Sequence, residues 1–148
     1  MNKYPLKQSS VLSLILGAIL GLITLVPYLG ILSFLICVFC SGTIVLLYMQ
    51  KMQLIDNLEI KEYTIYGTLN GFINFIGFSL TFVPLAVIIG LLAKTSYYLG
   101  VAIMFKGGIF IPTLIIIFLA LTAALMSGFG AMVTAYAMNF YNSQIKND

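Results

Sequence analysis

The chain has 148 residues, of which 61% are hydrophobic and 7% are charged, and its formal net charge is +3. A soluble domain carries roughly 25% charged residues, so this composition excludes a water-exposed globule and favours an integral membrane protein. All seven basic residues are scattered lysines, which excludes a nucleic-acid groove built from clustered charge. With no histidine in the chain, we expect no imidazole-based metal or haem site, and no cofactor.

Four apolar runs are long enough to cross a bilayer, for which about 18 consecutive apolar residues suffice. They predict one all-α, polytopic membrane domain over residues 1–148, with four transmembrane helices in two antiparallel hairpins. The first run resembles a signal peptide, but no small-residue cleavage motif follows it and more spans do, so we expect it to be retained. The predicted spans are about 7–26, 31–50, 64–93 and 109–141.

The connections between these spans carry their own signals. Pro27 and Gly30 predict a tight turn after the first span, with the positive φ at the glycine. Residues 51–63 mix both signs of charge and form a wet loop, in which Asp56 and Glu59 have capping-box spacing; we expect a helix to begin near Asn57. Residues 94–108 contain lysines and paired tyrosines, which suit the membrane interface.

Two of the predicted spans contain residues that disturb a helix. Pro84, in the third span, removes the hydrogen bond to the Leu80 carbonyl and predicts a kink. The fourth span is about 50 Å long at 1.5 Å per residue, against a hydrocarbon core of about 30 Å. It must therefore tilt, bend or project, and the Ser-Gly-Phe-Gly stretch at Ser127–Gly130 is the favoured point of bending.

Small and polar residues recur at helical spacing along one face of three spans. In lipid, helices associate through close packing and polar contacts, so such faces predict helix–helix interfaces. We interpret Asn70 and Asn74 as hydrogen-bonding neighbouring helices to fix their register, with the alternative that they line a path for a substrate or water. The candidate residues are Gly17, Gly21, Gly67, Asn70, Gly71, Asn74, Gly77, Thr81, Ala124 and Gly128.

The two cysteines, Cys37 and Cys40, form a C-x-x-C pair inside the second span, expected on one helix face. A redox pair needs a thiolate stabilised by a cation or a helix N-terminus, and a partner that exchanges electrons. The chain has no arginine or histidine and no second cysteine pair. We therefore predict two reduced cysteines that serve packing.

No hydrolase, metalloprotease, phosphate-loop or dinucleotide motif occurs, and no charged residue lies in a span core, which disfavours an enzyme or an ion-coupled transporter. The first hypothesis is a non-enzymatic membrane protein that acts by helix association, as a homo-oligomer or as an accessory subunit of a membrane complex. Its partners would be the lipid bilayer and either itself or another membrane subunit. The alternatives are a passive pore or carrier for a small neutral solute or lipid, and a thiol-redox protein using Cys37 and Cys40.

The lysine distribution predicts the orientation, because cytoplasmic loops carry an excess of basic residues. In a bacterial cytoplasmic membrane, five lysines on one side against two on the other predict that both termini lie in the cytoplasm. The inside lysines would be Lys3, Lys7, Lys51, Lys61 and Lys146, and the outside ones Lys94 and Lys106.

A cysteine scan tests this orientation in a background that lacks Cys37 and Cys40. We expect an impermeant maleimide added to intact cells to label Ser96→Cys and to leave Asn57→Cys unlabelled. The reverse pattern would contradict the orientation, and labelling at both positions or at neither would contradict the number of spans.

Overall fold

The computed structural model describes residues 5–55, 58–93 and 96–145. Within these ranges the chain is all-helical, as predicted, and four stretches are long and apolar enough to cross a membrane: Leu6–Thr24, Leu29–Lys51, Ile60–Leu92 and Phe110–Phe140. The elements in chain order are α1 (Leu6–Thr24), α2 (Leu29–Leu35), the π-helix η1 (Ile36–Cys40), α3 (Ser41–Lys51), α4 (Ile60–Ala93), α5 (Ser96–Lys106) and α6 (Phe110–Ile145).

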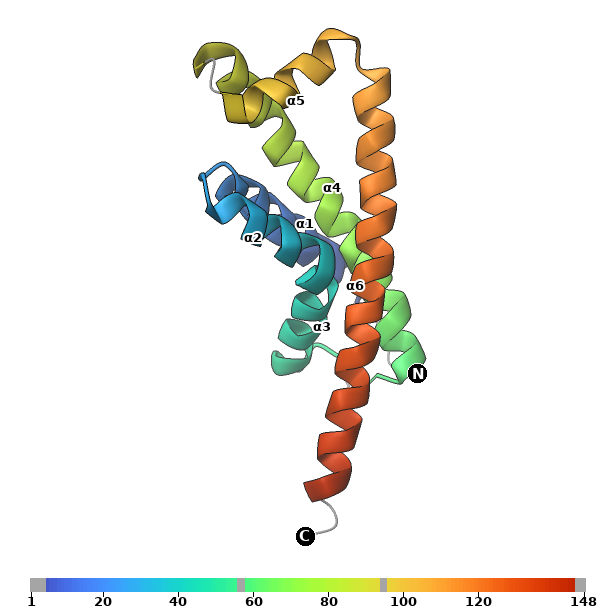
Figure 1. Cartoon of the computed structure of the whole chain (residues 1–148). Helices are drawn as coiled ribbons and strands as arrows, with labels where there is room; N and C mark the ends of the chain where they lie inside the picture. Colours follow the sequence, from blue (N-terminus) through green and yellow to red (C-terminus); the bar gives the residue numbers. More distant parts are fainter. Residues whose placement is uncertain (1–4, 56–57, 94–95, 146–148) are drawn as a thin grey trace.

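Helix α4 is the centre of the bundle and packs against α1, η1, α3, α5 and α6. Figure 1 shows α6 as the longest helix, running opposite to α4 and crossing it near the middle. The two helices separate toward the end of the molecule where α5 joins them. The core is therefore concentrated around α4, and a wedge opens between α4 and α6 on the α5 side.

Glycines allow the backbones of α1 and α4 to touch. A Cβ built at Gly17 would overlap the Asn74 carbonyl oxygen and lie 2.9 Å from the Phe78 nitrogen. On the other side of the same interface, a Cβ at Gly77 would lie 2.5 Å from the Leu14 carbonyl oxygen. Such close approach is how helices gain packing energy where hydrophobic burial offers little, so this contact sets the position of α1.

The turn after α1 differs from the prediction in its detail. The positive φ, 73°, falls on Tyr28 and not on Gly30. Helix α2 begins at Leu29, so Gly30 is already helical, and its N–H donates to the Val26 carbonyl at 3.2 Å. The conformational freedom of this glycine is therefore not what makes the turn.

The start of α4 also differs from the prediction. The Glu59 N–H donates to Glu62 Oε2 at 3.0 Å, which is the backward half of a capping box, and the helix begins at Ile60. The expected start near Asn57 is thus three residues too early. Asp56 and Asn57 themselves lie outside the described residues.

The two long helices run without interruption through their disturbing residues. Pro84 lies inside α4 and cannot donate a hydrogen bond to the Leu80 carbonyl. The Thr81 hydroxyl does not replace that hydrogen bond, because it donates to the Gly77 carbonyl at 3.1 Å. The stretch at 127–130 lies inside α6, where Gly128 contacts Thr68 and Gly130 contacts the Phe39 carbonyl. These two glycines are packing positions, and Figure 1 shows no sharp bend there.

Replacing Gly17 with alanine tests the close contact between α1 and α4. The added methyl group must displace the backbone at Asn74, so we expect the free energy of unfolding to fall by about 1–3 kcal/mol. Gly100→Ala is the matched control, because nothing lies within 4 Å of a Cβ at Gly100 in α5. The control should change stability by at most about 1 kcal/mol, in the stabilising direction. Unfolding by SDS, followed by circular dichroism, measures both, and equal effects would contradict the interpretation.

Candidate functional site

A chain of polar side chains crosses the centre of the bundle around Asn70 and Asn74, which are both fully buried. Ser9 in α1 donates a hydrogen bond to Asn70 Oδ1. Asn74 Oδ1 accepts a hydrogen bond from Cys37 Sγ at 3.1 Å, and Asn74 Nδ2 donates to the Ser13 carbonyl at 3.1 Å. The side chain of Asn74 therefore connects α1, η1 and α4 in one place.

The cysteines lie in the π-helix Ile36–Cys40, an element that the sequence did not predict. Hydrogen bonds from i to i+5 widen a π turn and change the angle between residues three apart. As a result Cys37 is fully buried whereas Cys40 is exposed, and both are free. The expectation that the two sulfur atoms share one face is wrong for this reason.

Ser127 of α6 links α3 and α4 to α6, through a hydrogen bond whose partner the sequence did not predict. The Gly42 N–H, in the first turn of α3, donates to Ser127 Oγ at 2.7 Å. The π turn interrupts the regular i to i−4 hydrogen-bond pattern just before this residue, and Ser127 provides an acceptor for the Gly42 amide. A Cβ at Gly71 would lie 2.5 Å from the Ser127 Cβ, so α4 also closes on this serine. The sequence signal that could have identified this contact is a serine set among small residues in an apolar run.

The small-residue faces pack inside the chain. Gly17 and Gly21 of α1 lie against the α4 backbone, and Gly77 lies against α1. Gly67 and Gly71 of α4 lie against α6. Ala124 and Gly128 of α6 are also buried, and Gly128 contacts Thr68. These faces, which motivated the association hypothesis, are accounted for by contacts within one chain.

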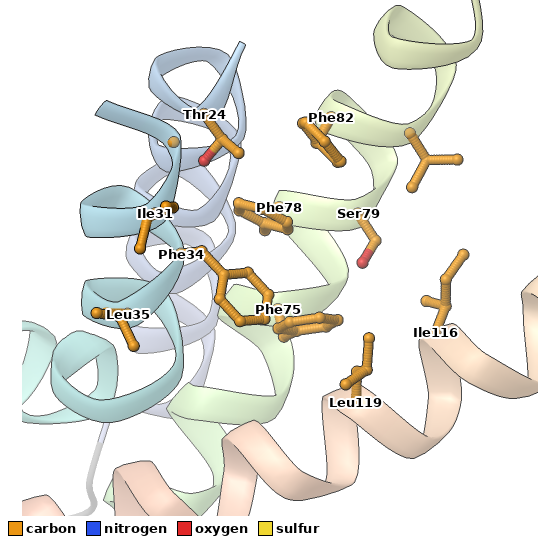
Figure 2. A pocket seen from close by; sticks show the side chains of 12 residues that line it. Thr24, Ile31, Phe34, Leu35, Phe75, Phe78, Ser79, Phe82, Ile116 and Leu119 are labelled. Carbon is orange, nitrogen blue, oxygen red and sulfur yellow. The ribbon is translucent and has the colours of Figure 1, made fainter. Parts of the chain in front are cut away.

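A cavity of about 330 Å³ lies in the wedge between α2, α4 and α6. Figure 2 shows Phe34 of α2 meeting a row of phenylalanines on α4, with Ile116 and Leu119 of α6 on the opposite side. Neither Asn70 nor Asn74 lines it, and Thr81 does not either. The lining residues are Thr24, Gly30, Ile31, Phe34, Leu35, Phe75, Phe78, Ser79, Phe82, Val83, Ile116 and Leu119.

The phenylalanines form a connected aromatic wall. Phe34 meets Phe75 and Phe78 edge to face, with ring centroids 6.3 and 6.0 Å apart. Phe78 stacks on both Phe75 and Phe82, at 5.5 and 5.4 Å. Aromatic pairs in these geometries are worth about 0.5–1.5 kcal/mol each beyond area burial, so the wall is stiff. The three phenylalanines of α4 recur at helical spacing, which is the signal that sequence reasoning overlooked.

Two hydroxyl groups reach the cavity. Thr24 donates to the Leu20 carbonyl of its own helix at 2.8 Å. Figure 2 shows the Ser79 hydroxyl directed into the space between α4 and α6, and the residue is 7% exposed. A cavity with this lining can hold an apolar chain by van der Waals contact and offers hydroxyl groups for orientation.

The described part of the chain contains no group of three His, Cys, Asp or Glu side chains able to hold a metal ion. No protein-family model, curated protein or solved structure matches the chain.

Replacing Asn74 with leucine tests the polar centre with little change in volume. The substitution leaves the Cys37 thiol without its acceptor and removes the amide donor from the Ser13 carbonyl, so we expect a loss of about 1–2 kcal/mol in the free energy of unfolding. Thr113→Val is the control, because the exposed Thr113 hydroxyl donates only locally, to the carbonyl of Ile109 directly before α6, at 2.7 Å. The control should stay within about 0.5 kcal/mol of the unsubstituted protein. SDS titration measures both, and an unchanged Asn74→Leu protein would contradict the assignment.

Proposed function

We propose that the protein is a non-enzymatic carrier or binding protein for an apolar molecule, with the acyl chain of a lipid as the ligand class. The ligand would occupy the cavity between α2, α4 and α6. The protein would cross a bacterial cytoplasmic membrane four times as two antiparallel hairpins, with both termini in the cytoplasm. The observation that carries the proposal is the aromatic cavity itself.

The chemistry of the cavity supports an apolar ligand. Its volume, about 330 Å³, lies at the lower end of the range for small-molecule pockets, roughly 300–1,000 Å³. Its lining is aliphatic and aromatic except for the hydroxyls of Thr24 and Ser79, and no described lining side chain is charged. Because lipid tails already surround a membrane protein, selectivity would come from shape and dispersion contacts with the stiff wall and not from the hydrophobic effect.

The other two hypotheses have less support. Helix association was motivated by small-residue faces that pack within one chain. A thiol-redox function would need the two sulfur atoms close together. Cys37, however, is buried and donates a hydrogen bond to the Asn74 amide oxygen, whereas Cys40 is exposed.

Photocrosslinking tests the proposal directly. The full-length protein is reconstituted with a phosphatidylcholine that carries a diazirine on one acyl chain, and the adducts are mapped by peptide mass spectrometry. We expect adducts concentrated on cavity residues such as Phe34 and Phe75, above the level on lipid-facing side chains. Adducts spread evenly over the lipid-facing surface would contradict the proposal.

A pair of adjacent substitutions provides the control. Leu119→Trp fills the cavity from α6, whereas Phe118, its neighbour, is 69% exposed and lies outside the lining. Overfilling a packed site costs about 1–3 kcal/mol, so Leu119→Trp should reduce cavity adducts about tenfold. Phe118→Trp should leave them unchanged. Equal losses in the two variants would mean that the adducts report general lipid contact.

A further inference from the structure

A second depression lies between α1 and α3 and shares no residue with the aromatic cavity. It has two parts, which meet at Leu12 and Tyr48. The inner part, about 200 Å³, is lined by aliphatic side chains of both helices, including Ile15 and Ile19 of α1. The outer part, about 670 Å³, includes Lys7 and Gln8 at the start of α1. The two parts together form the α1–α3 groove.

The groove follows the axis of α1. Leu12, Ile15 and Ile19 recur at intervals of three and four, which places them on one side of the helix. From Lys7 to Ile19 the helix rises about 18 Å. One leaflet of a bilayer has a hydrocarbon depth of about 15 Å, half of a core about 30 Å thick. The groove therefore has the length of a single acyl chain, with its polar part at the end where a headgroup lies.

The charge at the polar end selects the type of headgroup. Of the described side chains that line either part, Lys7 alone is charged, and it is exposed. An ammonium group binds a phosphate oxygen as a point charge and is favoured beside anionic lipids. Tyr48 lies where the two parts meet and is 46% exposed, as suits an aromatic ring at headgroup level.

We propose that the α1–α3 groove binds one anionic phospholipid, with its phosphate beside Lys7 and one acyl chain along Leu12, Ile15 and Ile19. This site is separate from the aromatic cavity and does not depend on the proposed function. The lipid would be a structural ligand that covers the α1 and α3 surfaces together.

Native mass spectrometry of the full-length protein in mild detergent tests the headgroup contact. The probes are phosphatidylglycerol and phosphatidylcholine with identical acyl chains, at equal concentrations. We expect phosphatidylglycerol to bind more tightly, and Lys7→Gln to reduce that preference about fivefold. Lys106→Gln is the control, because Lys106 is exposed at the end of α5 and lies outside the groove. Equal binding of the two lipids, or equal effects of the two lysine variants, would overturn the proposal.

A second pair of variants tests the acyl chain. Ile15→Trp fills the inner part of the groove and should weaken binding of both lipids, whereas Lys7→Gln changes only the preference between them. Ile88→Trp, at a residue of α4 that is 51% exposed and outside the groove, should have no effect. Inorganic phosphate should not displace the lipid; complete displacement would mean a free-phosphate site and would overturn the proposal. An unchanged Ile15→Trp protein would do the same.

Discussion

The contact between the backbones of α1 and α4 is the constraint on which the rest of the structure depends. Gly17 rests against the carbonyl of Asn74, and Gly77 rests against the carbonyl of Leu14, so neither helix can rotate without a steric clash. The Asn74 amide then reaches the Ser13 carbonyl in the same place. Backbone approach and hydrogen bonding thus specify the same arrangement, which is the combination expected of helices that lipid does not drive together.

Once α1 occupies one side of α4, the other sides of α4 have separate roles. Gly67 and Gly71 lie against α6, so the crossing of the two long helices is close. Phe75, Phe78 and Phe82 follow along α4 toward α5, where α6 diverges and contributes only Ile116 and Leu119 to the cavity lining. The aromatic cavity is therefore a direct result of a tight crossing at one end of α4 and a divergence at the other.

Long apolar runs allowed the fold class and the four long helices to be predicted from sequence, because the apolar length needed to span a bilayer is a simple physical requirement. Helical spacing also identified Gly17, Gly77 and the two asparagines as residues of special packing. The partner of each residue could not be predicted, because a stripe along one helix does not say which other helix meets it. Ser127 illustrates this limit: its position opposite Gly42 depends on the crossing of α3 and α6. The cavity depends on how far α4 and α6 diverge, which is a property of three helices together.

The π-helix has a consequence for how the second apolar segment divides its two halves. On its N-terminal side, α2 turns Ile31 and Phe34 toward the aromatic cavity. On its C-terminal side, α3 turns Gly42 toward α6. A π turn is equivalent to one extra residue inserted into an α-helix, and each α-helical residue corresponds to a rotation of about 100°. Deleting a single residue from Ile36–Cys40 would restore the regular period and rotate one half against the other by that amount. The length of this segment therefore sets the rotation of α2 relative to α3.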